Sequence, residues 1–461
     1  MLISLIRKEV ISHVLSLRFV ITFILTLLLG SISFTISATE YDHNIYEYGA
    51  RERGNRDVLE KILLLEDDGD RRWRIFGQEG KTEPVPVSKM SSVVQGLAPS
   101  LPAAINATRS RVTNIDRGIW RNPLLRMNHA PDIVYVVGVV MSLLAILYSF
   151  DSISGEKESG TLRLMLSNAV PRHTILLSKW VAGFSVLVTP FVVVYLAGVG
   201  YVWARGSLEL SGDQAVRLAM LLVMALLYIS VFFNLGLFVS CCTHRSTTSL
   251  FLCLLIWVAL VLAVPNLAPV IAKIMEPAPT IVEIEAEKRA VDDEIRLRMR
   301  RIYDLSGGLS YGERVQREQE KLEQEGEDRK KRWDRYLVNA TRQQTNLAGL
   351  LGRIGPSASW VYAATELTLT GPSVYDRLDG AAKRMRLRMD EMDEEIEKAH
   401  RNSNWEQMPE IRLDELPTLN LTYPTLDQSQ WVVLNDLLLL SMQIVIFFML
   451  SFALFLRYDV R

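Results

Sequence analysis

Six long apolar stretches separate the polar parts of this chain, and they constrain its fold more than any other feature. Each approaches or exceeds the roughly 18 to 20 residues that span a hydrocarbon core of about 30 Å. Apolar residues make up 49% of the 461 residues, which also points away from an ordinary soluble protein. Because lipid offers the backbone no hydrogen-bond partners, each stretch is predicted to be a helix. The predicted spans are residues 19–38, 133–150, 181–204, 218–241, 250–275 and 431–456.

The first span has an alternative interpretation as a secretory signal, because "TISATE" after it is similar to a cleavage site. Its apolar run is longer than that of a usual signal peptide, and residues 1–18 are a long amphipathic segment rather than a short basic tip. An uncleaved membrane helix is therefore favoured, preceded by an amphipathic N-terminal helix over residues 1–18.

Lysine and arginine side chains near the helix ends predict the orientation in the membrane. The one short outer connection holds only Arg205 and Arg217. With the N-terminus inside, the short inner segments hold more cations: Arg7, Lys8, Arg18, Lys157, Arg163, Arg172, Lys179, Arg245, Arg457 and Arg461. Both termini and residues 151–180 are therefore predicted to be cytoplasmic, in a multi-pass protein of the inner (cytoplasmic) membrane.

Cysteine positions and net charge exclude two further classes of protein. Cys241, Cys242 and Cys253 all lie within or at the ends of predicted spans, so the outer loops have no disulfide framework. The formal net charge of −1 provides no basic surface for nucleic acid.

Two long polar insertions, 39–132 and 276–430, are predicted to lie outside the membrane. Segments of this length are rarely structureless, so we expect a mainly helical extracytoplasmic domain assembled from both. The predicted fold class is therefore an all-α polytopic membrane protein, with six transmembrane helices and this extracytoplasmic domain.

Periodicity predicts the elements of these insertions. In the second insertion, apolar residues recur at spacings of four and seven: Ile284, Val291, Ile295 and Ile302. "SGGLSYG" then interrupts the pattern, so a helical hairpin is predicted, whose second helix runs from Glu313 to about residue 347. A third helix is predicted over 377–400. In the first insertion, we expect a helix over 55–68 and a pair of short strands around 71–80.

The cytoplasmic segment 151–180 contains "SGEKESGTLRLMLSNAVPRHTILLSK" and is predicted to form a short helix parallel to the membrane. Gly155 and Gly160 relax the chain, Thr161 is placed to cap the helix, and Pro171 ends it. The apolar residues of the helix share one face: Leu162, Met165 and Leu166. Such a helix has two interpretations, a docking element for a soluble partner or a capped helix at the membrane interface.

This segment resembles the signature of ABC-2-type transporter permeases. In that signature a charged E-x-E-x-G-T-L run precedes a Pro-Arg pair and a Lys that opens the next helix, and here "GEKESGTL" is followed by "MLSNAVPRHTILLSKW". The order of six helices and the amphipathic N-terminal "elbow" are similar too. The two large insertions and "GPSASWVYAATELTLTG" resemble a subgroup distantly related to the gliding-motility and nitrous-oxide-reductase maturation permeases.

The resemblance implies that the chain is one membrane half of an exporter. Its partners would be a separate ATPase, which binds the ATP and Mg, and a second permease copy as homodimer or related heterodimer. Residues 151–180 would hold the coupling helix that sits in a groove of the ATPase. The residues to which this role falls are Glu156, Glu158, Gly160, Thr161, Leu162 and Arg163.

Motifs for ATP hydrolysis and for metal binding are absent from the sequence. "SGEKESGT" has the residue types of a phosphate-binding loop but neither its spacing nor a preceding strand, so the chain is not predicted to hydrolyse ATP or to bind a cofactor of its own. H-E-x-x-H and C-x-x-C do not occur and the six histidines are scattered, so no metal site is predicted, and no catalytic site is predicted either.

Polar and helix-breaking residues inside the predicted spans are the remaining candidates, because burying polar groups in lipid is unfavourable. They are candidates for a translocation path or a dimer interface: Asn234, Pro265, Asn266, Asn435 and Asp436. The alternative for Asp436 is a place near the outer interface, about one and a half turns from Trp431.

Three functional hypotheses differ in what they require of the sequence. A transport subunit needs a partner that contacts two states of the membrane helices differently. A membrane-anchored signalling or scaffold protein normally adds a cytoplasmic effector domain, for which the longest inner segment is too short. A membrane-embedded enzyme needs a convergent nucleophile, base or metal set. The sequence favours the transport subunit, with an outer domain that contacts substrate or an extracytoplasmic protein.

Overall fold

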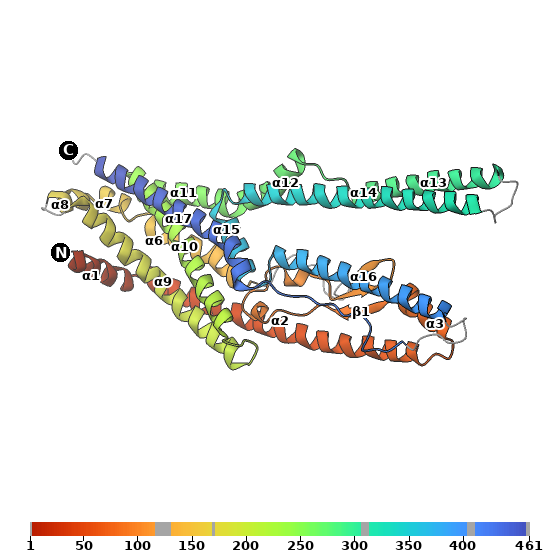
Figure 1. The fold of residues 1–461 in the computed structure, drawn as a ribbon. Coiled ribbons are helices and arrows are strands. Elements are labelled where there is room, and N and C mark those ends of the chain that lie inside the picture. The colour runs from red at the N-terminus through yellow and green to blue at the C-terminus, as the bar shows by residue number, and fades with distance from the viewer. Residues whose placement is uncertain (1, 116–130, 168–170, 306–312, 403–410, 458–461) are drawn as a thin grey trace. The chain divides into compact units, whose positions relative to one another are not determined.

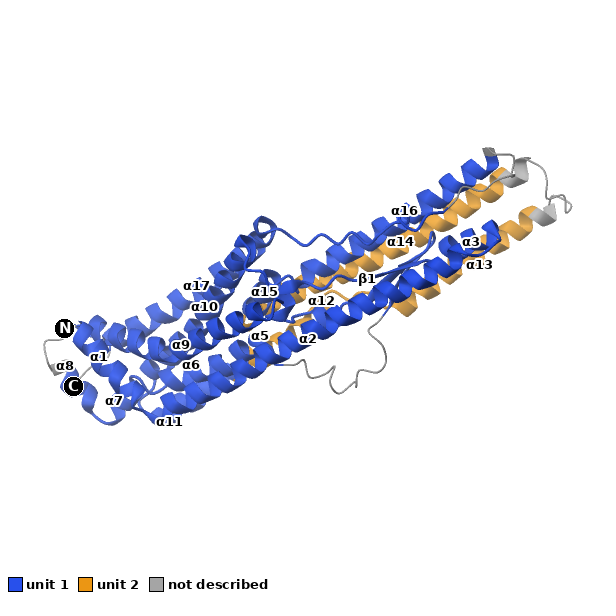
Figure 2. Cartoon of the chain, turned by 90° about the horizontal axis from the view of Figure 1, so that it is seen from below, with its two compact units in different colours: residues 1–257, 359–461 blue, residues 258–358 orange. Residues whose placement is uncertain are grey.

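The computed structural model describes residues 2–115, 131–167, 171–305, 313–402 and 411–457. The chain forms two compact units, which Figure 2 distinguishes by colour. Unit 1 comprises residues 1–257 and 359–461, and unit 2 comprises residues 258–358.

Six helical segments of the described chain are long and apolar enough to cross a membrane, which confirms the predicted all-α polytopic fold class. The predicted spans lie inside these segments, and the limits of the lipid-embedded part of each remain predictions. The segments are α2 (Leu17–Leu63), Ile133–Glu158, α9 (Arg172–Ala204), α10 (Gly212–Cys242), Ser246–Met275 and α17 (Leu426–Arg457). Ile133–Glu158 contains α5 (Ile133–Tyr135), η4 (Val136–Met141), α6 (Ser142–Ser149) and α7 (Ser154–Glu158), and Ser246–Met275 contains α11 (Ser246–Trp257), η5 (Val258–Ala263) and α12 (Val264–Met275).

Helix α10 forms the centre of the bundle in unit 1. It packs against α6 and α17, while α9 packs against α2 and the N-terminal helix α1 (Leu2–Val14) (Figure 1). Every residue of α10 from Tyr228 to Leu237 is buried, which is expected only for a helix surrounded by protein on all sides. Gly236 permits the close approach of α6, because a Cβ there would fall 2.0 Å from Ser149 Oγ.

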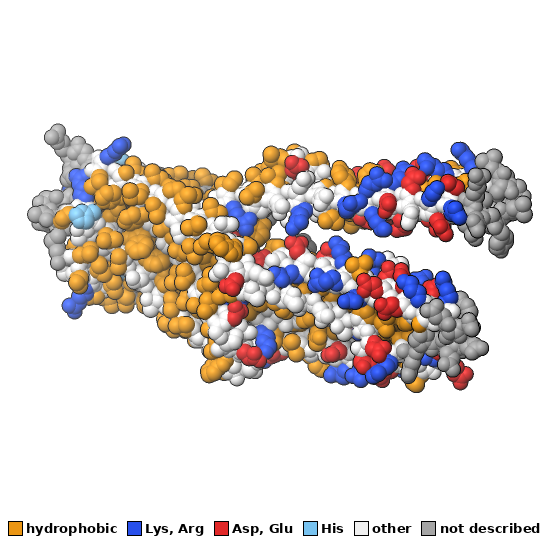
Figure 3. Space-filling view, viewed as in Figure 1, with side chains coloured by type: hydrophobic (Ala, Val, Ile, Leu, Met, Phe, Trp, Pro, Cys, Tyr) orange, Lys and Arg blue, Asp and Glu red, His pale blue; other side chains and the backbone are white. Residues whose placement is uncertain are grey.

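Hydrophobic and charged side chains divide the surface of unit 1. Figure 3 shows hydrophobic side chains over α1, α9 and α17 and charged side chains over α16 (Pro372–Asn402). The exposed apolar residues of α17 include Leu438, Met442 and Val445, which a water-soluble bundle would bury. This division matches a bundle that lies in lipid and an adjoining part that lies in water.

Helix α2 is one continuous helix of 47 residues, and its polar end contains residues 55–63 of the helix predicted over 55–68. The predicted helix therefore continues the membrane helix, and it ends five residues earlier than predicted. Ser16 begins α2, because its hydroxyl accepts a hydrogen bond from the Phe19 N–H at 3.3 Å. No proline occurs in the polar half of α2, residues 39–63. An ion pair between side chains one turn apart, Arg56–Glu60 at 2.9 Å, stabilises the polar half, and the helix ends at Leu63.

The predicted strand pair around 71–80 is wrong. Helix α3 (Asp68–Arg72) runs directly into the π-helical turn η1 (Trp73–Gln78). Ile75 and Phe76 are neighbours in sequence and both are buried, a pattern that a half-exposed strand with alternating faces does not allow. The strands lie further along: β1 (Lys81–Pro84), β2 (Ala104–Ala107) and β3 (Val112–Ile115) form an antiparallel sheet in the order β1-β2-β3.

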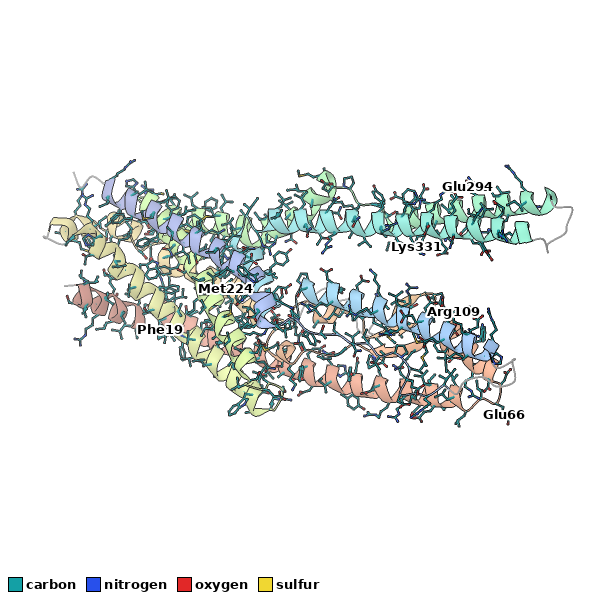
Figure 4. All side chains as sticks on the ribbon, in the orientation of Figure 1. Phe19, Glu66, Arg109, Met224, Glu294 and Lys331 are labelled. Atoms are coloured by element: carbon teal, nitrogen blue, oxygen red, sulfur yellow. The ribbon has the colours of Figure 1, made fainter. Side chains whose placement is uncertain are left out.

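Both insertions contribute to one core in unit 1. Leu59 and Ile62 at the end of α2 pack with η1, with the sheet, with α16 and with residues 411–423. An ion network lies beside this core, where Arg72 and Arg109 bind Asp393 of α16. Figure 4 labels Arg109. Arg72 also binds Glu397 at 2.9 Å. The side chain of Asp393 is only 5% exposed, and a carboxylate so far removed from water needs compensating charge. The two guanidinium groups of Arg72 and Arg109 provide it.

Unit 2 is a helical hairpin with a charged surface. Helices α12 and α13 (Ile281–Leu305) both pack along α14 (Glu313–Gly352). Ile284, Val291 and Ile295 are buried in the α13–α14 contact. Ion pairs flank this seam, Arg329–Glu294 and Lys330–Asp292, both at 2.8 Å. These helices carry the apolar periodicity noted in the sequence of the second insertion.

Candidate functional site

Two short helices, α7 and α8 (Thr161–Ser167), lie at the end of the bundle where α1 begins and α17 ends (Figure 1). Gly160 separates them and has a φ of +74°, a left-handed conformation that glycine adopts without steric strain. A Cβ added there would meet no atom within 4 Å, so only the backbone requires glycine. The Thr161 hydroxyl lies 2.8 Å from Ser159 Oγ, and it therefore ties α8 back to α7.

Helix α7 is fixed to the end of α10. Ser240 Oγ accepts hydrogen bonds from the N–H groups of Ile153 and Ser154, at 3.0 and 2.9 Å. Lys157 Nζ donates to the carbonyl oxygens of Cys241 and Thr243, at 2.5 and 3.0 Å. These carbonyls belong to the C-terminal end of α10, where helix geometry leaves them without partners and where a cation is favourable.

Glu158 makes the complementary contact with α11. Its carboxylate accepts a hydrogen bond from the backbone N–H of Ser246, at 2.9 Å, where α11 begins. An anion is favourable at that end of a helix, because the first N–H groups are unpaired and the helix dipole is positive there. Adjacent side chains of α7 therefore bind the end of one membrane helix and the start of the next.

Glu156 lies on the inner side of α7 and binds Lys179 of α9 at 2.7 Å. Lys179 also binds Glu9 of α1 at 3.3 Å. The exposed fractions of the three side chains are 8% for Lys179, 19% for Glu156 and 17% for Glu9, so this ion triad is largely shielded from water. Glu156 is one of the residues predicted for coupling, and its side chain faces the bundle.

Leu162 also points inward. It is fully buried in a cluster with Ile175, Leu176 and Phe455, and Met165 packs against the same cluster. The side chain of Leu166, the third member of the predicted apolar face, lies outside the described residues. Helix α8 is therefore held on the bundle through the face that its amphipathic pattern predicts.

The other four candidates lie, with two neighbouring residues, on an exposed surface, which we call the solvent face of the α7–α8 pair. Its members are Glu158, Ser159, Gly160, Thr161, Arg163 and Leu164. Four of the six residues predicted for coupling are among them. Leu164 was missed in the sequence, although it is 69% exposed and stands opposite the buried Leu162. The sequence does contain a signal for it, because a large apolar residue on the polar side of an amphipathic helix indicates a contact surface.

The residues predicted for a path or interface lie on α10 and α17 in unit 1 and on α12 in unit 2. Asn234 is buried between α9 and α10, where it accepts a hydrogen bond from Trp180 Nε1 at 3.0 Å and donates to the Ser230 carbonyl at 2.7 Å. In α17, Asp436 is buried and Asn435 is exposed. In unit 2, Asn266 is exposed and donates to the Leu262 carbonyl at 2.7 Å, and Pro265 before it is half-buried.

Arg217 has a structural role that the sequence did not indicate. It is fully buried at the start of α10 and binds Asp213 at 2.8 Å. Its guanidinium also donates to the Pro424 carbonyl, to Ser429 Oγ and to the Leu367 carbonyl, at 2.8, 3.3 and 3.4 Å. Leu367 ends α15 (Pro356–Leu367) and Ser429 lies in the first turn of α17. Arg217 thus joins α10 to two later parts of unit 1.

Among the described residues, no group of three or more His, Cys, Asp and Glu side chains is arranged to hold a metal ion.

These features define an α-helical, multi-pass membrane protein with a short charged helix pair at one end of its bundle. The sequence model of a family described as ABC-2 family transporter protein matches residues 3–460, and the chain belongs to this family. It is therefore a membrane permease subunit of an ABC transporter and not itself the catalytic subunit, and its family implies an ATPase partner. No curated protein matches the chain.

Proposed function

We propose that this permease couples ATP hydrolysis by a separate ATPase subunit to export or to mechanical work outside the membrane, and that the α7–α8 pair is the coupling element. In this proposal, the solvent face of the pair docks into the ATPase, which binds the ATP and Mg. Two permease copies would then act with two ATPase subunits.

The observation that supports this proposal is the position of three consecutive charged side chains of α7. Glu156 binds Lys179 of α9, Lys157 binds the end of α10, and Glu158 binds the start of α11. A displacement of α7 therefore acts on three membrane helices at once. A helix that only lay at the membrane interface would not need contacts to three separate membrane helices.

The solvent face has the character expected of a docking surface. Leu164 offers an apolar group, and Arg163 and Glu158 offer charges on either side of Gly160. The buried Leu162 packs α8 against the bundle on the opposite side, so a displacement of the solvent face also displaces the bundle residues that contact Leu162.

The orientation proposed for this element follows from the distribution of cations. Arg7, Lys8 and Arg18 lie on or beside α1, and Arg172 begins α9, at the bundle end that carries α7 and α8. Positive charge near helix ends favours the cytoplasmic side. We therefore place both termini and the α7–α8 pair in the cytoplasm, with the inner membrane of a cell as the location.

The test is co-purification with a co-expressed ATPase encoded beside the permease gene. Burial of one leucine side chain contributes about 1.5 to 3 kcal/mol, so Leu164→Asp is expected to lower the affinity for the ATPase by about tenfold or more. Leu64→Asp is the matched control, because Leu64 is 81% exposed at the other end of unit 1. If wild-type permease retains no ATPase, or if both variants retain it equally, the α7–α8 pair is not the coupling element and the scaffold hypothesis gains.

The outer insertions are proposed to contact substrate or an extracytoplasmic protein. Unit 2 contains the charged α13–α14 hairpin, whose surface carries exposed side chains such as Tyr336 and Val338. Deletion of residues 281–352 removes this hairpin while it leaves α16 and the core of unit 1. We expect transport activity to fall with ATPase binding unchanged, and unchanged activity would count against this part of the proposal.

A further inference from the structure

We infer that Lys179 is a positioning residue that makes the N-terminal helix α1 move together with the coupling element. This inference rests on the proposed function, because it concerns how movement of α7 reaches the rest of the bundle. Its basis is the ion triad of Lys179, Glu156 and Glu9.

The triad joins three elements that are distant in sequence. Lys179 lies two turns into α9, Glu156 is in α7, and Glu9 is in α1. The ammonium group is 2.7 Å from a Glu156 oxygen and 3.3 Å from a Glu9 oxygen, so one cation serves both carboxylates. When α7 moves, Lys179 can follow Glu156 only by moving relative to Glu9 or by taking Glu9 along.

Burial of the triad favours movement of Glu9, and with it α1, together with Lys179. All three side chains are at most 19% exposed, so water screens their attraction weakly and stabilises a separated charge poorly. Glu156 Oε2 is buried and has no hydrogen-bond partner among the described residues. Lys179 is thus the main compensation for the Glu156 charge, and separating them would leave a buried carboxylate uncompensated.

Helix α1 is built to pass such a movement on. It packs along α9 and connects to α2 through a tight corner at Ser16. The Ser16 hydroxyl donates to the His13 carbonyl at 2.6 Å and accepts from the Phe19 N–H at 3.3 Å, so the corner is fixed on both sides. Helix α2 then continues without interruption to Leu59 and Ile62 in the outer core of unit 1.

The triad therefore places α1 and α2 on a route from the coupling element to the outer core. Spatial continuity alone does not demonstrate coupling, so the route requires a measurement of response at both ends. The measurement must detect a change in α1 that occurs when nucleotide binds the ATPase and that is lost when the triad is broken.

The experiment is amide hydrogen exchange of the full permease–ATPase complex in lipid nanodiscs, with and without a non-hydrolysable ATP analogue. In wild type we expect the analogue to change exchange in both α8 and α1. Glu9→Leu leaves the Lys179–Glu156 pair balanced, and we expect it to reduce the α1 response at least threefold while the α8 response stays. Lys8→Leu, at an exposed neighbouring position, is the matched control and should respond like wild type.

Two further variants separate coupling from folding. Lys179→Met is expected to lose the α1 response, and Lys179→Arg is expected to restore it, because arginine can also bind two carboxylates. An α1 response of wild-type size in Glu9→Leu and in Lys179→Met would overturn the inference while the proposed function stands. An α8 segment that does not respond to nucleotide in wild type would contradict the proposed function itself.

Discussion

Lys157 and Glu158 are neighbours in the chain, and they bind opposite kinds of helix end. Lys157 donates to the carbonyl oxygens that end α10, and Glu158 accepts from the N–H that begins α11. Each charge suits the dipole of the helix end that it meets. The turn between α10 and α11 is thus held by a single short helix, which is the element proposed to receive force from the ATPase.

Reversing this pair of charges should loosen that turn. The double variant Lys157→Glu/Glu158→Lys places each charge at the helix end that repels it, and we expect a lower melting temperature in detergent and weaker ATPase coupling. The comparison is Lys288→Glu/Asp334→Lys, which swaps an exposed ion pair in unit 2. A melting temperature equal to that of the comparison variant would show that the contacts to α10 and α11 contribute nothing to stability.

Substitution of Gly160 should act through the backbone alone. The left-handed conformation costs a residue with a Cβ about 1 to 2 kcal/mol, so Gly160→Ala is expected to destabilise the α7–α8 corner by about that amount. Gly160→Asn should cost less, because asparagine tolerates this conformation. Gly200→Ala is the control, since a Cβ there also meets no atom within 4 Å and the residue lies inside α9. Protease susceptibility of residues 151–180 measures the effect, and equal susceptibility in Gly160→Ala and Gly200→Ala would contradict it.

Removal of Arg217 should release α15 and α17 from the start of α10. Arg217→Leu leaves three buried oxygen acceptors without their donor, those of Leu367, Pro424 and Ser429. A buried acceptor without a partner costs about 1 to 3 kcal/mol, so we expect a total loss of about 3 kcal/mol or more. Arg217→Lys should rescue only part of this loss, because an ammonium group cannot reach as many acceptors as a guanidinium. Thermal unfolding of the two variants measures the difference. Arg205→Leu removes a more exposed ion pair with Asp42 and should change unfolding little.

The sequence predicted the membrane helices well and the positions of several side chains poorly, for a physical reason. Six apolar stretches can satisfy their backbones in lipid only as helices, so their existence follows from composition and length. The inward position of Glu156 depends on Lys179 and Glu9, which come from other elements and cannot be paired by local pattern. Arg217 looked like a loop cation for the same reason, although Asp213 one turn earlier was a hint.

The errors in the first insertion also have physical causes. The segment after the first span is polar, and a membrane helix was assumed to end where its apolar run ends. Helix α2 continues because helix formation depends on propensity and ion pairs such as Arg56–Glu60 and not on apolarity. Ile75 and Phe76 are buried side by side in a π-helical turn, and their burial depends on core residues from other elements that the local sequence does not identify.

Acid should weaken the outer core through Glu397. The Arg72 guanidinium beside Glu397 lowers the pKa of that carboxyl below its ordinary value of 4.5 in the folded protein. A carboxyl with a lowered pKa stabilises the fold above its unfolded pKa, and this contribution is lost as pH falls through the folded pKa. We therefore expect wild type to be more stable than Glu397→Gln at pH 6 to 7, and the difference to shrink below about pH 4.5. Thermal unfolding across this range checks the sign, and a difference that grows on acidification would contradict it.

The central claim is that the solvent face of the α7–α8 pair lies against the ATPase, and site-specific photo-crosslinking tests it most directly. A photoreactive amino acid is introduced in place of Leu164 in the full complex, and in place of Leu64 as the control. We expect a crosslink from position 164 to the ATPase subunit, stronger in the ATP-bound state, and none from position 64. Crosslinks from position 164 to lipid alone, or to a second permease copy alone, would contradict the claim and leave α8 as a helix of the membrane interface.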